Sequence, residues 1–123
     1  MMLLRAIIAA LLVAGAAQAQ TVIIYSRADS AQAHRAQQLA AVYGQALIDR
    51  QLPPGALWRP TIADWICGGQ RVLLLWSASA AASNEIRREL DTAIACQRQI
   101  VPVLLDSTPL PGVIGDTQAI DWR

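Results

Sequence analysis

Residues 71–90, RVLLLWSASAAASNEIRREL, contain the segment that decides the fold class. The segment begins with an apolar run at 72–76 between polar neighbours, which predicts a strand buried on both faces. A linker of small residues follows at 77–82. Ser83 then suits a helix N-cap, because its hydroxyl can accept from a first-turn N–H. A strand, a loop and a helix in this order predict one unit of a parallel α/β sheet.

The helix after Ser83 has one apolar face and carries a candidate functional acid at the edge of that face. The apolar positions recur at i, i+4, i+7 and i+8, at Ile86, Leu90, Ala93 and Ile94. Glu89 lies about 80° from the centre of this stripe. Ligands of open α/β sheets bind beyond the carboxyl ends of the strands, beside the following helices, so Glu89 is a candidate site residue. A plain surface acid beside Arg87 and Arg88 is the alternative.

Four more strands and two more helices are expected around this unit. The strands are expected at residues 21–26, 46–49, 100–105 and 118–122. One helix is expected at 31–44, with an apolar stripe of Leu39, Val42, Tyr43, Ala46 and Leu47. The other helix is expected to end at Gly68-Gly69, and its apolar residues at helical spacing are Trp58, Ile62, Trp65 and Ile66. This alternation predicts one α/β domain with a five-stranded parallel sheet and helices on both faces.

The first 19 residues have the three parts of a secretory signal peptide. Arg5 precedes an apolar run at 6–17, and the small residues of Ala17-Gln18-Ala19 place the expected cleavage after Ala19. The run is shorter than the roughly 20 residues that a membrane span needs. We therefore expect residues 20–123 to form the mature domain, periplasmic or secreted, without membrane contact. An uncleaved anchor or a mis-assigned start codon is the alternative.

The charge balance argues against a nucleic-acid partner. The chain has 10 arginines, no lysine and 9 acids, and loss of residues 1–19 removes only Arg5, which leaves a formal charge of zero. There is no basic patch, so nucleic acid is not expected to bind.

The two cysteines, Cys67 and Cys96, lack the spacing of a metal site, and no metal is expected. In an exported chain they could form a disulfide, or they could be buried free thiols.

Generic enzyme signatures are absent from the chain, which contains no GxxxxGK[ST], GxGxxG, HExxH or GxSxG motif. Five segments nevertheless follow the order and spacing of one family. They are IYSRAD at 24–29, IDRQLPPGALW at 48–58, the segment 77–90, IVPVLLD at 100–106 and AIDW at 119–122. Over residues 21–122 the chain resembles a bacterial TIR (Toll/interleukin-1 receptor) domain.

The resemblance implies a flavodoxin-like three-layer sandwich with strand order 2-1-3-4-5. Many TIR domains cleave NAD at the nicotinamide–ribose bond, and the resemblance implies that Glu89 is the catalytic carboxylate here. A negative charge at that place would stabilise the oxocarbenium-like ribose of the transition state. Trp58 would stack on the nucleotide, unless it is a core residue. The loops lining the same cleft would contribute Arg27, Asp29, Ser30 and Ser79. NAD would be the substrate, so no cofactor is expected.

Other TIR domains only assemble with like domains, which gives the alternative function. The chain would then be a non-catalytic module of signal transduction that self-associates through the loop of Pro53, Pro54 and Gly55, the BB loop of the family.

Two features of the sequence depart from the family pattern. Glu85 stands where the family usually has Trp, and as a second acid near Glu89 it should raise the pKa of both if they are desolvated. The chain stops at Arg123, so the family's last helix is expected to be missing.

Overall fold

The computed structural model describes residues 20–42, 44–49, 52 and 54–123. The expected signal peptide, Tyr43 of the expected stripe and Pro53 of the expected assembly loop lie outside the described residues. Five parallel strands form one sheet in the order β2-β1-β3-β4-β5. In chain order they are β1 (Gln20–Ile24), β2 (Gln45–Leu47), β3 (Arg71–Trp76), β4 (Gln99–Leu104) and β5 (Ile120–Asp121). The expected α/β class and strand order are confirmed.

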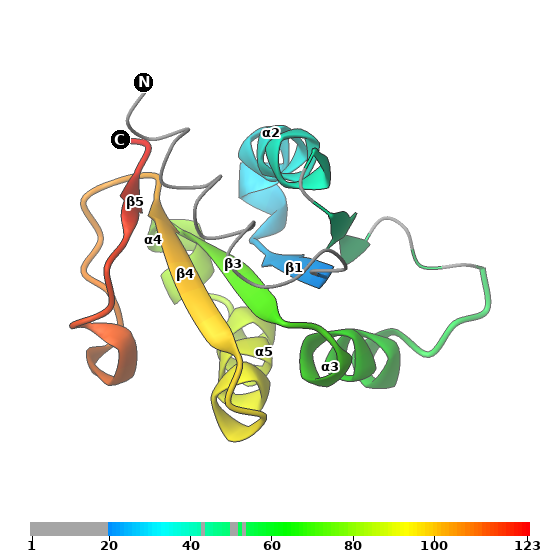
Figure 1. The fold of residues 1–123 in the computed structure, drawn as a ribbon. Coiled ribbons are helices and arrows are strands. Elements are labelled where there is room, and N and C mark those ends of the chain that lie inside the picture. The colour runs from blue at the N-terminus through cyan, green and yellow to red at the C-terminus, as the bar shows by residue number, and fades with distance from the viewer. Residues whose placement is uncertain (1–19, 43, 50–51, 53) are drawn as a thin grey trace.

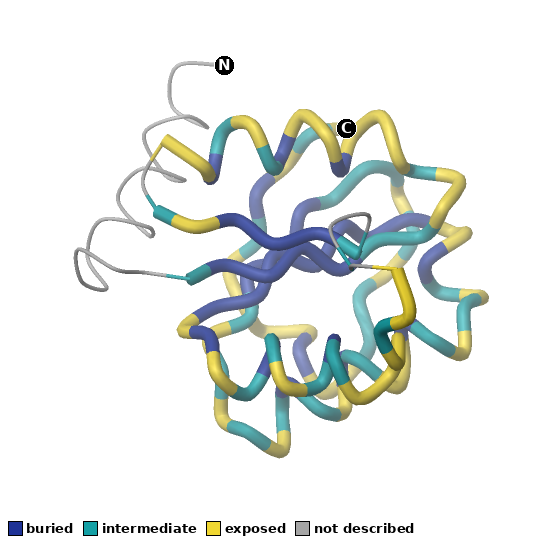
Figure 2. Tube along the Cα trace, turned by 90° about the vertical axis from the view of Figure 1, so that its right-hand side faces the viewer, coloured by how far each residue is buried: buried dark blue, intermediate teal, exposed yellow. Residues whose placement is uncertain are grey.

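Strand β3 lies at the centre of the sheet, and all of its residues are buried. Its side chains alternate between the two faces. Leu73 and Leu75 join the core cluster on one face of the sheet. Val72, Leu74 and Trp76 join the cluster on the other face. Figure 2 shows the buried strands running between two layers of helices. The burial on both faces explains why the run at 72–76 is apolar without interruption.

Helices cover the two faces of the sheet unequally. Helix α2 (Ser30–Ala41) packs on one face, and helices α3 (Trp58–Gly68) and α5 (Asn84–Ala95) pack side by side on the other (Figure 1). The shorter elements are η1 (Arg27–Asp29), α4 (Ala78–Ala81) and η3 (Gly112–Ile114). In the chain, η1, α3 and α4 are the first elements after the carboxyl ends of β1, β2 and β3, and α5 follows α4.

The core face of α2 is not the one expected from the sequence. Ala33, Ala36 and Ala40 are the buried residues of the helix, whereas Val42, just after its end, is 76% exposed. The small alanines let α2 lie close to the sheet. The chain leaves the helix at Ala41, and residues 46–47, which also fit the helical spacing, are instead buried in β2. A short apolar run satisfies both periods, so its spacing alone could not separate helix from strand.

The segment expected to be a linker contains the short helix α4. The Ser77 hydroxyl caps it by accepting from the Ala80 N–H at 3.1 Å, and alanine has the highest helix propensity of any residue. Helix α5 follows with the expected N-cap, since the Ser83 hydroxyl accepts from the Ile86 N–H at 3.2 Å. The core face of α5 is also the expected one, with Ile86, Leu90 and Ala93 buried.

Helices α3 and α5 are tied together at their C-terminal ends. Cys67 and Cys96 form a disulfide with Cα atoms 5.4 Å apart, so the alternative of two buried free thiols is wrong. Beside it, the Arg98 guanidinium donates to the Cys96 carbonyl at 2.9 Å and to the Gly69 carbonyl at 2.7 Å. Gly69 ends α3, where an added Cβ would lie 3.0 Å from the Trp65 carbonyl oxygen. Covalent and polar contacts therefore fix one end of the helix pair.

The C-terminal end of the described chain completes the α2 side of the core. Strand β5 is the last element within the described residues. Trp122 packs against the core cluster on this face, and the Arg35 guanidinium lies 4.6 Å from the centre of its ring. None of the helices within the described ranges has the length and apolarity that crossing a bilayer requires.

Loss of the Cys67–Cys96 disulfide is expected to destabilise the domain. The bridge joins residues 29 apart in sequence. By chain entropy, a closed loop of that size contributes about 3–4 kcal/mol to the free energy of unfolding. Urea unfolding followed by tryptophan fluorescence should show this loss for the Cys67→Ser/Cys96→Ser variant. A reductant should destabilise the wild type by the same amount and leave the variant unchanged. Equal midpoints for oxidised and reduced wild type would contradict the prediction.

Candidate functional site

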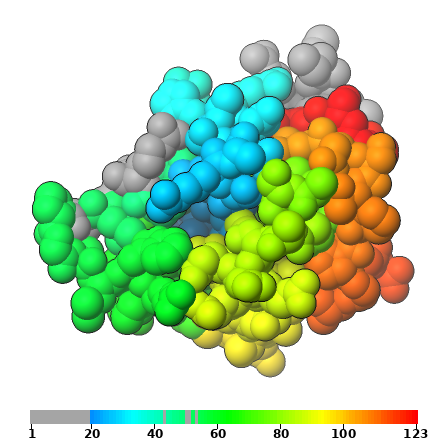
Figure 3. Space-filling view, turned by 180° about the vertical axis from the view of Figure 1, so that it is seen from behind, coloured from blue at the N-terminus to red at the C-terminus, as the bar shows by residue number. Residues whose placement is uncertain are grey.

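The candidate site lies at the carboxyl ends of β1, β2 and β3. In the order β2-β1-β3, the chain turns to one side of β1 and then to the other, and open α/β sheets bind ligands at such a reversal. Figure 3 shows this face of the molecule hollowed where the η1, α3 and α5 segments meet. Two neighbouring cavities make up the hollow, and Trp58 lines both of them.

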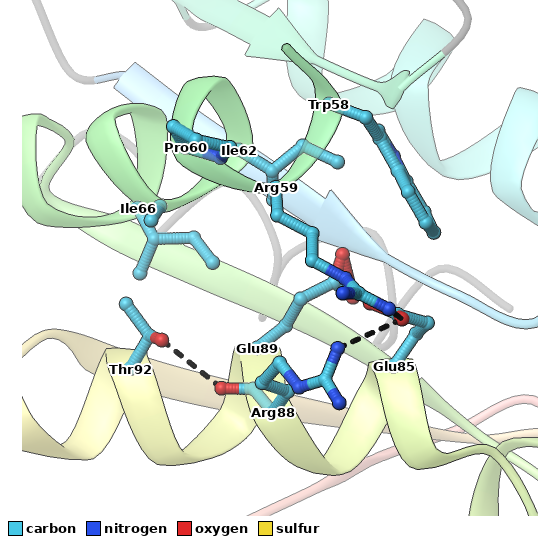
Figure 4. Close-up of a pocket in the computed structure, with 10 residues that line it drawn as sticks. Trp58, Arg59, Pro60, Ile62, Ile66, Glu85, Arg88, Glu89 and Thr92 are labelled. Atoms are coloured by element: carbon cyan, nitrogen blue, oxygen red, sulfur yellow. Dashed lines mark hydrogen bonds and ion pairs between the residues drawn. The ribbon is translucent and has the colours of Figure 1, made fainter.

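The first cavity lies between α3 and α5 and has a volume of about 280 Å³. Its walls include the apolar side chains of Ile62 and Ile66 from α3. Trp58, at the start of α3, and Glu89, on α5, line the same cavity. Figure 4 shows Glu89 extending from α5 on the side that faces α3. The cavity therefore combines an apolar wall, an aromatic ring and one carboxyl group.

The second cavity, of about 500 Å³, lies on the other side of Trp58. Residues from the ends of β1 and β2 and from the loops after them line it: Tyr25, Arg27, Ser30, Asp49, Leu52 and Trp58. The lining is more polar than that of the first cavity. Trp58 is 37% exposed and stands at the first residue of its helix, so it is not a core residue.

The carboxyl group of Glu89 is held in an unusual electrostatic environment. Burial, and to a smaller extent the nearby negative charges of Asp49 and Glu85, together raise its pKa from 4.5 to about 7. No hydrogen bond or ion pair to another described residue offsets the burial. Glu89 can therefore exchange a proton near neutral pH, which is a property of many catalytic acids and bases.

Glu85 behaves differently from Glu89, although the two acids lie one turn apart. Its Oε1 atom accepts from Arg59 Nη2 at 2.6 Å, from Arg59 Nε at 3.1 Å and from Arg88 Nη1 at 3.0 Å (Figure 4). The hydrogen bond from Arg59 is the largest cause that holds the pKa of Glu85 below its usual value. The expectation that the pair raise each other's pKa is thus correct for Glu89 and wrong for Glu85, because Glu85 has its own cations.

Asp49 is the second carboxylate close to Glu89. It follows β2 and accepts a hydrogen bond from the Tyr25 hydroxyl at 2.5 Å. Asp49 and Tyr25 line the second cavity, and together with Glu89 they also line a small hollow of about 10 Å³. Asp49 therefore connects the polar cavity to the candidate catalytic acid.

Of the three candidate residues after β1, only Arg27 and Ser30 line a cavity. Arg27 and Ser30 line the second cavity, on the far side of Trp58 from Glu89. Asp29 instead accepts a hydrogen bond from the Ser77 hydroxyl at 2.5 Å, which joins the end of β1 to the end of β3. Ser79 is exposed on α4 and lines neither cavity. Only Glu89, Trp58, Arg27 and Ser30 of the six sequence candidates line the two cavities.

The comparison with known sequences decides the family. The sequence profile of the TIR domain family matches residues 22–123. The chain belongs to the TIR domain family. The resemblance drawn from five short segments is confirmed at this level, over nearly the whole of the described chain.

Solved structures support the fold. The crystal structure of the TIR domain of the Toll-related Receptor TRR-2 from Hydra magnipapillata superposes with a TM-score of 0.73. The similarity covers 83% of this chain and 82% of that one, at 20% sequence identity, which establishes the TIR-like fold alone. No curated protein matches this chain.

Residues 54–57, just before α3, include one of the most exposed apolar side chains among the described residues. Leu57 is 73% exposed, and Pro54 and Gly55 are also exposed. Gly55 has a φ of +83°, a conformation that favours glycine and that fixes the turn. Leu57 directly precedes Trp58, which lines both cavities.

Sequence reasoning missed Asp49, Tyr25 and Arg59. Asp49 and Tyr25 follow strands of the parallel sheet, and the position of an acid and a hydroxyl at two strand ends was a usable signal. Arg59 gave no such signal, because its role depends on the packing of α3 against α5. The described residues hold no group of three or more metal-ligating side chains.

The raised pKa of Glu89 should make the stability of this TIR domain depend on pH. The carboxyl keeps its proton longer in the folded chain than in the unfolded chain, so stability falls as pH rises from 4.5 to about 7. Glu89→Gln removes this loss. It should raise the free energy of unfolding by about 3 kcal/mol at pH 8, and by little at pH 4.5.

Urea unfolding at pH 4.5, 6 and 8 provides the measurement. Asp91→Asn is the matched control, because it removes an exposed carboxylate from the same helix. A difference between wild type and Glu89→Gln that stays constant over this range would contradict the raised pKa.

Proposed function

We propose that this TIR domain cleaves NAD at the nicotinamide–ribose bond. The observation that carries the proposal is the position of Glu89, a half-buried acid that shares a cavity with Trp58. TIR domains serve in signalling, and some of them are NAD-cleaving enzymes. NAD is consumed as a substrate, so the proposal needs no cofactor.

The reaction breaks the C–N bond between ribose C1 and the nicotinamide nitrogen. The bonding electron pair leaves with nicotinamide, whose ring becomes neutral, and the ribose carbon acquires positive charge. An ionised Glu89 beside this carbon stabilises that charge, and it does so strongly because the site is partly shielded from water. Water then adds to C1 and loses a proton, which yields ADP-ribose. An internal nucleophile would give a cyclic product instead.

Other residues of the two cavities have supporting roles in this proposal. The exposed ring of Trp58 stacks on a base or on nicotinamide between the cavities, as aromatic side chains do with nucleotides. Arg27 and Ser30 contact the polar part of the nucleotide from the second cavity. Asp29 acts through Ser77 by holding the first loop in place. We assign no contact to Ser79, which lies away from both cavities.

Nicotinamide release is the direct test. Purified wild type, concentrated or crowded, should release nicotinamide from NAD at a rate that rises as pH increases through about 7, because Glu89 acts when ionised. Glu89→Gln should lower the rate at least about a hundredfold, the usual loss of a charge-stabilising group. Asp91→Asn should match the wild type. A wild type that stays inactive under all these conditions would refute the proposal.

Self-association is the second candidate function, and the exposure of Leu57 favours it. TIR domains interact with other TIR domains, and an apolar side chain that is 73% exposed on a fixed turn suits such a contact. In this reading the loop of Pro53, Pro54 and Gly55 forms the interface. The domain would then act as a signalling module with or without NAD cleavage.

Replacement of Leu57 tests self-association separately from NAD cleavage. Leu57→Asp, or replacement of Pro54, should reduce self-association measured by light scattering, because a charge or a changed turn disrupts an apolar contact. Val113→Asp is the matched control, since Val113 is 66% exposed on the distant η3. Oligomers that are the same size in all variants would exclude the loop as the interface.

We further propose that the domain works outside the cytoplasm. The disulfide between Cys67 and Cys96 supports export, because such bonds persist in oxidising compartments. Together with the leader pattern of residues 1–19, it favours a periplasmic or secreted domain that begins at Gln20. Protein recovered from an exporting host should contain no free thiol and start at Gln20; a retained leader with reduced thiols would refute export.

A further inference from the structure

The two carboxylates of the site come from different elements and meet at one place. Asp49 follows β2, and Glu89 lies on α5. Both line the same small hollow, together with Tyr25 from the end of β1. The hollow has a volume of only about 10 Å³, so little solvent separates the groups that surround it.

Asp49 is held in this position from two sides. The Tyr25 hydroxyl donates to its Oδ1 atom at 2.5 Å, and the Leu52 N–H donates to its backbone carbonyl at 3.1 Å. The hydrogen bond from Tyr25 fixes the direction of the carboxylate and leaves its second oxygen available. Among the described residues, no cation forms an ion pair with Asp49.

The other charged groups near Glu89 are already paired. Glu85, one turn earlier on α5, has its charge balanced by Arg59 from α3 and by Arg88 from α5. The negative charge of Asp49 has no such balance, and among the charges that act on Glu89 it has the larger effect. Asp49 is therefore the neighbour that most influences the Glu89 carboxyl.

We propose that Asp49, held by Tyr25 beside the hollow that it shares with Glu89, is a positioning residue whose charge favours the protonated form of Glu89 at the start of the reaction. This inference rests on the proposed NAD cleavage for its role in catalysis, although the contact itself does not. Burial and the charge of Asp49 together let Glu89 keep its proton up to near-neutral pH, so Glu89 carries its negative charge only above it. Without the charge of Asp49, Glu89 ionises at lower pH.

The chain allows an unusually direct test, because Glu85 and Glu89 are its only glutamates. Labelling with ¹³C-glutamate gives two side-chain carboxyl signals in NMR, and Glu89→Gln assigns them. A titration from pH 4 to 9 then reports each midpoint without any activity measurement. Asp49→Asn should lower the Glu89 midpoint by roughly half to one pH unit, while Asp91→Asn should leave it unchanged.

Tyr25→Phe provides a second variant. It keeps the charge of Asp49 but removes the hydrogen bond that aims it, so it should lower the Glu89 midpoint by less than Asp49→Asn does. If Asp49→Asn fails to fold, this variant decides the question. A Glu89 midpoint that moves in neither folded variant would overturn the proposal.

The pH profile of nicotinamide release connects the contact to catalysis. At pH 6, a midpoint lowered by half to one unit raises the ionised fraction of Glu89 about three- to fivefold, so activity relative to its plateau should rise as much. If Asp49→Asn shifts the Glu89 midpoint in NMR but leaves the pH profile of nicotinamide release unchanged, the proposed role of Asp49 in catalysis is wrong. An inactive wild type together with a shifted Glu89 midpoint in Asp49→Asn would refute NAD cleavage and still support the effect of Asp49 on Glu89.

Discussion

The packing of α3 against α5 is the constraint on which the candidate site depends. At one end of the pair, the Cys67–Cys96 disulfide and Arg98 join the helices, and at the other end Arg59 reaches Glu85. The covalent tie matters most, because exposed ion pairs contribute little stability by themselves. Between the two ends lies the cavity that contains Glu89. A separation of the helices would expose that acid to water and return it to the behaviour of an ordinary surface carboxylate.

The fold of this TIR domain could be predicted from its sequence wherever burial dictates residue type. The run at 72–76 is buried on both faces, and Ser83 caps a helix whose apolar face was the one expected, so local signals and the final structure agree. The core face of α2 could not be predicted in the same way. Alanines that allow close packing carry no strong periodic signal, and the apolar run beyond them was ambiguous between helix and strand.

The candidate site could also be predicted only in part from the sequence. Glu89 and Trp58 could be placed from their spacing and from the family resemblance, and they line one cavity. The residues around Glu89 could not be predicted, because they come from three segments that are distant in sequence: the end of β2, α3 and α5 itself. Asp49 was visible only as the end of a strand, and the sequence pattern does not show that Glu85 would be neutralised by Arg59 while Glu89 would not. Protonation states therefore depend on tertiary packing more than on the identity of neighbours along the helix.

These features describe an acid whose pKa lies near neutral pH, in a hollow formed by two neighbouring cavities. The most direct test of that account is to add NAD to ¹³C-glutamate-labelled protein and follow the two carboxyl signals. The account predicts that the Glu89 signal shifts with NAD concentration until it saturates, and that the Glu85 signal moves less because its oxygen is already held by Arg59 and Arg88. Signals that do not change at millimolar NAD would contradict the placement of the substrate beside Glu89.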